Sequence, residues 1–163
     1  MKTLTINSSL NQVKTTLGWM GKLRDQHKAE PAFVELARTI VRRAGAHTLE
    51  QECEAVRVWV KAFIDFRLDP EGVEYLQDPA YLLQESRTGD CDDMACLACT
   101  LLACIGHDCY PVGVCWAGTR QASHAVCWDS TAQLIVDPVS EFPCDGWPGM
   151  GLAVGEYVLG GRV

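Results

Sequence analysis

The chain has 163 residues and a formal net charge of −7, with 48% hydrophobic and 21% charged residues. This length fits one domain, residues 1–163, around one hydrophobic core. The negative charge disfavours nucleic acids and anionic membranes as partners, because both are themselves negatively charged. The longest uncharged apolar run, residues 94–106, is shorter than the roughly 20 residues that cross a bilayer. The polar N-terminus lacks the apolar core of a signal peptide, so we expect a cytoplasmic protein.

The first elements in chain order are an arm and a helix. Residues 1–30 are polar and weakly periodic, which predicts an irregular N-terminal arm with Trp19 and Met20 as anchors. A helix is expected to begin at Pro31, because proline suits a first helical turn, and to end at Gly45.

Two more helices and a long loop are predicted next. Thr48 and Gln51 are spaced as a capping box, and the apolar residues that follow predict a helix over residues 49–66. Residues 67–89 contain several prolines and glycines, so we expect mainly loop there. Residues 92–105 are almost all apolar or small, which predicts a helix that is buried on every side.

The hydrophobic period changes after Gly106. Short β-prone runs follow, with turn-like segments between them, and their sequences are YPVGVCW, SHAVCW and QLIVDP. We expect the core to span residues 31–147 and an irregular tail with at most one strand over residues 148–163. N-terminal helices and a buried helix that pack on an antiparallel sheet make an α+β fold.

The cysteines do not predict a disulfide scaffold. There are nine of them, an odd number, and a chain of this length folds without covalent staples. Most lie in apolar sequence, where a reduced thiol behaves as a small buried hydrophobic group. Cys91 differs, because it lies in the acidic motif GDCDD directly before the buried helix.

Cys91 is the candidate nucleophile. A thiol in the first turn of a helix is close to the positive end of the helix dipole, which favours the thiolate. Asp90, Asp92 and Asp93 oppose ionisation, unless they serve only to cap the helix. Activation of Cys91 therefore requires a cationic partner.

His124 and Asp137 are candidates for that partner and its orienting group. A hairpin with its turn at Ser130 and Thr131 would place His124 directly opposite Asp137, close enough for the carboxylate to hold the imidazole. His124 would then deprotonate Cys91, and Asp137 would fix the ring's tautomer. A loop longer by one residue would put the two side chains on opposite faces of the sheet. The remaining histidines are expected at the surface, and they are His27, His47 and His107.

These motifs, in the order GDCDD, SHAVCW and VDP, carry a family resemblance. The chain resembles the transglutaminase-like superfamily of cysteine proteases, especially short single-domain members carried by phages and prophages, over residues 31–147. The resemblance implies a papain-like α+β core with a catalytic triad on Cys91, His124 and Asp137. It also implies a setting in the bacterial host cytoplasm or with the virion, protein or peptide substrates, and phage virion or assembly proteins as partners.

The function expected from the sequence is a cysteine hydrolase or acyl transferase of peptidase, amidase or transglutaminase type. It would act on an amide bond through a thioester on Cys91 and would need no cofactor. Backbone N–H groups of Cys91 and Asp92 could stabilise the oxyanion, with the side chain of Gln84 as a candidate helper. Relatives often have tyrosine at the position of Phe66, so a hydroxyl that could assist the site is absent here.

Two alternatives compete with the enzyme. Cys91, Cys96 and Cys99 have the spacing of a plant-type [2Fe–2S] ligand set, with Cys127 as a fourth ligand. On one helix, however, Cys96 points about 140° away from Cys91, so we expect no metal site. The other alternative is a catalytically silent phage structural or assembly protein that keeps the fold.

Overall fold

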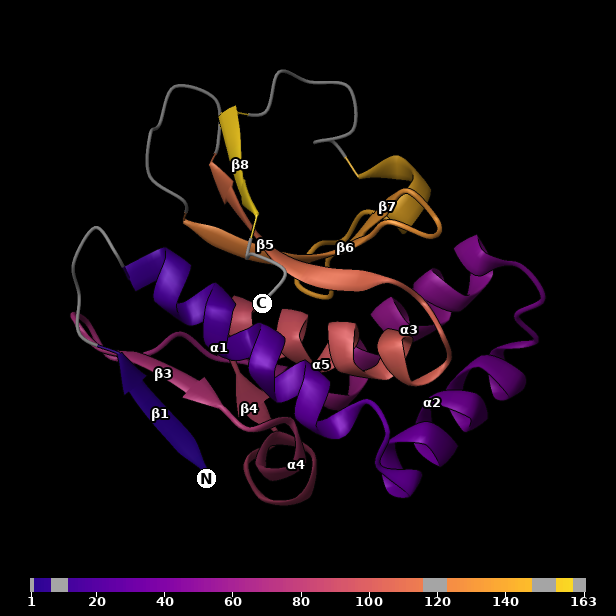
Figure 1. The fold of residues 1–163 in the computed structure, drawn as a ribbon, viewed down its shortest axis with the longest axis horizontal. Coiled ribbons are helices and arrows are strands. Elements are labelled where there is room, and N and C mark those ends of the chain that lie inside the picture. The colour runs from indigo at the N-terminus through magenta and orange to yellow at the C-terminus, as the bar shows by residue number, and fades with distance from the viewer. Residues whose placement is uncertain (1, 7–11, 116–122, 148–154, 160–163) are drawn as a thin grey trace.

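The protein has the predicted α+β fold, with helices packed on one side of an antiparallel sheet (Figure 1). A computed structural model describes residues 2–6, 12–115, 123–147 and 155–159. Within these parts of the chain, no helix combines the length and the apolar character needed to span a bilayer.

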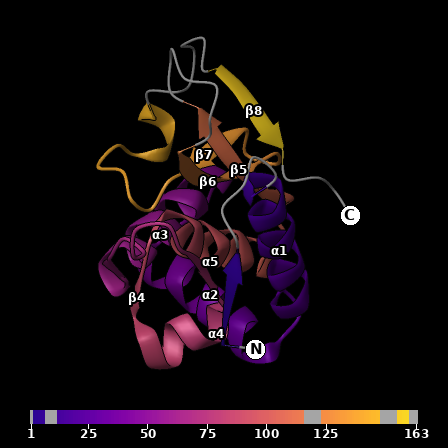
Figure 2. The same cartoon turned by 90° about the vertical axis from the view of Figure 1, so that its left-hand side faces the viewer.

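Helix α5 (Cys91–Cys104) forms the centre of the fold. Its residues from Asp92 to Leu102 are all buried, as predicted for an apolar helix. Helices α1 (Gln12–His27), α2 (Pro31–Ala44) and α3 (Leu49–Phe63) all contact it, and α1 and α3 lie on opposite sides of it (Figure 2).

The predicted bounds of α2 and the predicted start of α3 are confirmed, but α3 ends at Phe63 rather than at residue 66. Gly45 ends α2 in the left-handed conformation, with φ of 66°, which glycine adopts without steric cost. Thr48 caps α3 by accepting a hydrogen bond of 3.3 Å from the N–H of Gln51. The Gln51 side chain accepts from the N–H of His47 at 2.8 Å, one residue earlier than in a standard capping box.

Residues 12–27 form a helix, which differs from the irregular arm expected there. Leu17, Met20 and Leu23 are buried, and they make one apolar stripe that packs with residues of α5. The sequence signal was weak because the other positions of α1 are mostly polar. Contact with α5 stabilises this helix, as is common for short helices.

Residues 67–89 are more ordered than the expected loop, and they connect α3 to the start of α5. Short elements fill this segment: β3 (Glu74–Gln77), α4 (Pro79–Tyr81), the π-helical turn η1 (Leu82–Ser86) and β4 (Thr88–Gly89). Strand β3 pairs with β1 (Thr3–Ile6), and β4 pairs with β2 (Asp65–Phe66), which follows the end of α3. These partners are distant in sequence, so local patterns could not predict them.

The main sheet has the strand order β7-β6-β5-β8 and is antiparallel throughout. Its strands are β5 (Cys109–Cys115), β6 (His124–Asp129), β7 (Leu134–Val136) and β8 (Gly155–Leu159). A short 3-10 helix, η2 (Cys144–Gly146), precedes Trp147. The predicted turn between β5 and β6, like most of the predicted tail, lies outside the described residues.

Candidate active site

Cys91 and His124 line one cavity of about 300 Å³. Cys91 is the first residue of α5, and His124 is the first residue of β6. Residues of α1 form another wall of the cavity, which the sequence did not predict, and these are Val13, Thr16 and Leu17. Three acidic residues complete its polar lining, and they are Glu74, Asp90 and Asp92.

His124 and Asp137 are joined by a hydrogen bond of 2.9 Å between Nε2 and Oδ2. The predicted direct pairing is wrong, because Cys127 pairs with Val136 and the loop is longer than expected. This register places Asp137 diagonally from His124. Because the shift is two residues, both side chains stay on the same face, and diagonal neighbours are still within reach of long side chains.

The side chain of Asp129 explains the longer hairpin loop. Its Oδ1 accepts hydrogen bonds from the N–H groups of Thr131 and Ala132, at 2.8 and 3.2 Å. Gln133 closes the loop with φ of 58°, a conformation uncommon outside glycine. An aspartate that accepts hydrogen bonds from backbone N–H groups two or three residues later in the chain is a common turn former. This interaction does not show in the hydrophobic pattern.

Asp137 is held in place by donors on both oxygens. Oδ1 accepts from the N–H groups of Val139 and Ser140, at 3.1 and 3.3 Å. The indole N–H of Trp147 donates to Oδ2 at 3.0 Å. Burial alone would raise the pKa of Asp137, but its bond to His124 and these donors lower it below the usual value. The sequence analysis missed Trp147, because nothing in its glycine-rich surroundings indicates a buried donor.

His124 favours the protonated form. Burial lowers its pKa, but the hydrogen bonds to Asp137 and Cys91 and the charge of the Asp137 carboxylate outweigh burial and raise the pKa to about 10. Since Nε2 bonds to Asp137, Nδ1 is the ring nitrogen left for the thiol of Cys91. The structure therefore supplies the cationic partner that the acidic surroundings of Cys91 require.

The acidic cluster beside Cys91 is less negative than its sequence suggests. Burial, together with nearby carboxylates, holds the pKa of Asp92 well above its usual range and raises that of Asp93 to about 7. Asp93 is bound by Gln77, whose N–H and side-chain amide donate to its two oxygens at 2.7 and 2.6 Å. Partial protonation near neutral pH weakens the repulsion that these groups exert on a thiolate at Cys91.

Gly89 is a glycine for steric reasons. A Cβ atom at this position would lie 2.7 Å from Oδ2 and 2.8 Å from Cβ of Asp93. The chain therefore passes directly over the Asp93 side chain before it enters α5 at Cys91. The motif GDCDD contains both residues of this close approach, but the motif alone does not show that they are in contact.

The predicted oxyanion donors are only partly brought to the site. The N–H of Asp92 donates to Oδ1 of Asp90 at 3.3 Å, because Asp90 caps α5. The N–H of Cys91 lies in the first helical turn, where amides have no partner within the helix. Gln84 is exposed on η1 and is not part of the cavity lining, and Phe66 is also exposed.

The predicted surface positions of His27 and His107 are wrong. Only 4% of His27 and 6% of His107 is exposed. His107 lies between Asp129 and Glu52, and these two partners raise its pKa to about 9 against the effect of burial. The predicted surface placement failed because the carboxylates that hold these rings come from distant segments.

The cysteines of the iron–sulfur alternative point in different directions. Cys91 lines the cavity, whereas the thiol of Cys96 donates to the carbonyl of Met20 in α1 at 3.6 Å. Cys99 instead lies beside Cys109 and Cys127. The [2Fe–2S] ligand set is therefore not assembled.

A second cavity of about 300 Å³ lies beside the His124–Asp137 pair. It is lined by Ser123, His124, Asp137, Val139, Ser140, Phe142 and Trp147. His124 thus borders two spaces, one shared with Cys91 and one shared with Trp147. The imidazole can therefore contact groups bound in either cavity.

Three comparisons relate the chain to known proteins. Residues 34–136 match the sequence profile of the transglutaminase-like superfamily. Among solved structures, the chain is similar to a "Putative Cysteine Protease from Cytophaga hutchinsonii", with 15% identity and a TM-score of 0.48. The match covers 69% of this chain and only 39% of that protein. A search of curated proteins found no significant match.

Proposed function

Because the chain belongs to the transglutaminase-like superfamily, we propose that it is a cysteine hydrolase or acyl transferase that acts on amide bonds. The supporting observation is the shared cavity of Cys91 and His124, with His124 bound to Asp137. A cysteine at a helix N-terminus, an imidazole and an orienting carboxylate are the parts that thiol catalysis requires.

In the proposed resting state, Cys91 and His124 form a thiolate–imidazolium pair. The dipole of α5 favours the thiolate at its N-terminus. Asp137 stabilises the imidazolium and, through its bond to Nε2, keeps Nδ1 directed to the sulfur. The indole of Trp147 and the N–H groups of Val139 and Ser140 keep the Asp137 carboxylate ionised and oriented toward His124.

Acylation then proceeds by attack of the Cys91 sulfur on the carbonyl carbon of the amide. The carbonyl oxygen becomes an oxyanion, which the N–H of Cys91 is placed to stabilise. When the C–N bond breaks, His124 gives its proton to the leaving amine, and the acyl group remains on Cys91 as a thioester.

The second cavity suggests the path of the amine. It is lined by His124 and Trp147, and it shares Ser123 and His124 with the cavity of Cys91. We assign the acyl part of the substrate to the first cavity and the leaving or accepting amine to the second. His124 then deprotonates either water or an incoming amine, and this nucleophile releases the acyl group from Cys91.

We propose proteins or peptides as substrates, because the reactive bond is an amide. The resemblance of the three short motifs to phage and prophage relatives further supports a phage-encoded enzyme. Such an enzyme would work in the cytoplasm of the bacterial host or on virion and assembly proteins.

Acylation by an activated ester tests the proposal. Purified protein is mixed with p-nitrophenyl acetate at neutral pH, and the acylated residue is identified by peptide mass spectrometry. We expect one acetyl group on Cys91, removed by hydroxylamine and absent in Cys91→Ala. The matched control is Cys104→Ala, which removes another partly exposed thiol of α5 and should leave labelling unchanged. Acylation that is equal in wild type and His124→Ala would contradict the proposed roles.

A further inference from the structure

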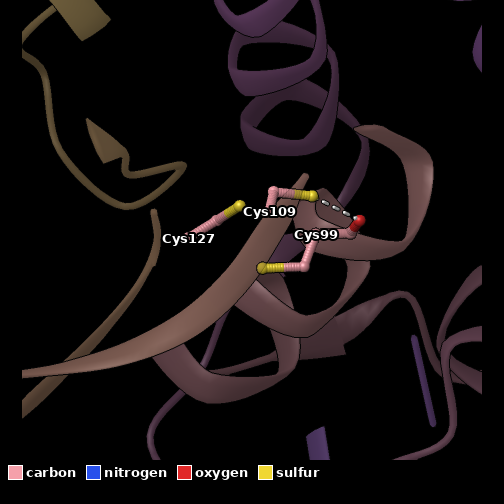
Figure 3. Close-up of side chains that lie close together, drawn as sticks. All are labelled: Cys99, Cys109 and Cys127. Carbon is pink, nitrogen blue, oxygen red and sulfur yellow. Dashed lines mark hydrogen bonds between the residues drawn. The ribbon is translucent and has the colours of Figure 1, made fainter. Parts of the chain in front are cut away.

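Three buried thiols converge between helix α5 and the main sheet (Figure 3), and none of them lines the cavity of Cys91. They belong to Cys99 on α5, Cys109 on β5 and Cys127 on β6, and their sulfur atoms all lie within 4.8 Å of one another. Exposure is 0% for Cys99, 2% for Cys109 and 0% for Cys127. We refer to these residues as the thiol cluster.

The sheet register explains why the thiols meet. Cys127 pairs with Pro111, and Cys109 pairs with Asp129, so Cys109 and Cys127 are diagonal neighbours on one face of the sheet. Helix α5 contacts both strands and brings Cys99 to this face. The thiol of Cys109 donates to the backbone carbonyl of Cys99 at 3.1 Å, which joins the helix to the sheet at this point.

We propose that the thiol cluster is a binding site for a monovalent copper ion. This site is separate from the proposed catalytic site and goes beyond the proposed function. Thiolates are soft ligands that select Cu⁺ and Zn²⁺ among the common biological metals. On binding, thiol protons are released and the sulfur lone pairs coordinate the ion, with no change in oxidation state.

The spacing of the sulfur atoms fits one metal ion. A metal at the centre of three sulfurs, each about 2.3 Å away, holds them about 4 Å apart. The sulfur atoms of the cluster already lie within 4.8 Å of one another, so a shift of less than about 1 Å suffices. Side-chain rotations and small strand adjustments can supply such a shift without changing the fold.

The number of ligands favours Cu⁺ over Zn²⁺. Structural zinc sites almost always have four ligands in a tetrahedron. Among the described residues, the group around Cys99, Cys109 and Cys127 contains no fourth cysteine, histidine or carboxylate. Monovalent copper is satisfied by three sulfurs in a plane, and an exposure of at most 2% for each cysteine keeps solvent water away from the cluster.

A nearby cation, Arg24, offsets part of the negative charge of a copper–thiolate group, and it also forms an ion pair with Asp25. The guanidinium of Arg24, from α1, donates to the carbonyl of Cys109 at 2.6 Å. The positive charge of Arg24 also interacts with the thiols of Cys99 and Cys109. An uncompensated buried charge would be costly, so this arginine is a favourable neighbour for a metal site.

A metal ion here would join the two elements that carry the proposed catalytic residues. Cys99 lies on the helix that begins with Cys91, and Cys127 lies on the strand that begins with His124. Copper would therefore fix α5 on β6 below the site. Because the cluster is fully buried, we expect the ion to enter during folding rather than afterwards.

Refolding with copper tests this inference. Protein carrying Cys91→Ala, so that the thiol of the proposed catalytic site cannot compete, is refolded anaerobically with Cu⁺ buffered by bicinchoninate. We expect one copper per chain, with only sulfur neighbours in X-ray absorption spectra. Cys99→Ala and Cys127→Ala should each lower copper affinity at least about tenfold, whereas Cys96→Ala, another fully buried thiol of α5, should not.

Several results would overturn the inference. One is a chain that refolds to its native circular dichroism spectrum but takes no copper from bicinchoninate. Another is an X-ray absorption spectrum that shows nitrogen or oxygen neighbours of the copper. This measurement does not depend on the Cys99→Ala variant, so it remains decisive if that variant fails to fold. A parallel refolding with Zn²⁺ that fills the cluster when Cu⁺ does not would also contradict the choice of metal.

Discussion

Replacing Asp137 with asparagine should lower the pKa of His124 and slow catalysis. The pKa of His124 is about 10, compared with 6.5 for the free side chain. At 1.36 kcal/mol per pKa unit, this difference favours the imidazolium by roughly 5 kcal/mol. Asp137 contributes more to it than Cys91 does, so Asp137→Asn should remove at least about 2 kcal/mol of that preference.

The expected consequences follow from that magnitude. The loss corresponds to a His124 pKa lower by at least roughly 1.5 units. Turnover should fall by up to about thirtyfold where the lost stabilisation of the imidazolium acts in full on the transition state. The asparagine amide can also hold the imidazole in the wrong tautomer, which would slow the reaction further. The pKa of His124 is measured by NMR titration of its ring, and turnover by release of the amine product.

The control is Glu52→Gln, which removes from a second histidine, His107, a carboxylate that lies outside the β6–β7 hairpin. It should lower the pKa of His107, now about 9, and leave the titration of His124 unchanged. A His124 titration that is the same in wild type and Asp137→Asn would refute the reasoning, because the bond between them would then have no electrostatic effect.

Two further predictions concern the segment around Cys91. Gly89→Ala should destabilise the protein by about 1–3 kcal/mol, because the new Cβ would clash with Asp93. The control is Gly21→Ala, which should not destabilise it, because a Cβ there meets nothing within 4 Å. Urea unfolding measures the stability of both variants. A rise in stability in Gly89→Ala would contradict the clash. The pKa of Asp93 is raised to about 7 in the folded protein, so its protonated side chain stabilises the fold in full below pH 4. This stabilisation is lost as the pH rises from 4 through 7, and the free energy of unfolding falls by about 4 kcal/mol over that range. Stability should therefore fall less steeply between pH 4 and 7 in Asp93→Asn, and an unchanged slope would show that Asp93 ionises normally.

The parts of the fold that the sequence could predict have local causes. The start and end of α2 follow from Pro31 and Gly45, and the start of α3 follows from the side chain of Thr48. The burial of α5 follows from its continuous apolar composition. In each case the residues that decide the structure are neighbours in the chain, so their spacing is enough.

The parts of the structure that the sequence failed to predict depend on contacts between distant segments. Helix α1 is stabilised by α5, the hairpin register depends on the side chain of Asp129, and Asp137 is completed by Trp147. The position of the triad candidates could be predicted because motifs mark them. The thiol cluster could not, because only strand pairing shows that Cys109 and Cys127 are neighbours.

Selective alkylation of Cys91 tests the central proposal most directly. Folded protein receives a limiting dose of iodoacetamide at a pH near 6, and the labelled cysteines are identified by peptide mass spectrometry. Cys104 is the internal reference, because it is also partly exposed and burial raises its pKa to about 11. We predict that Cys91 is labelled first and that His124→Ala abolishes its advantage, because the cation that stabilises the thiolate is lost. Labelling of Cys91 no faster than of Cys104, or unaffected by loss of His124, would contradict the account.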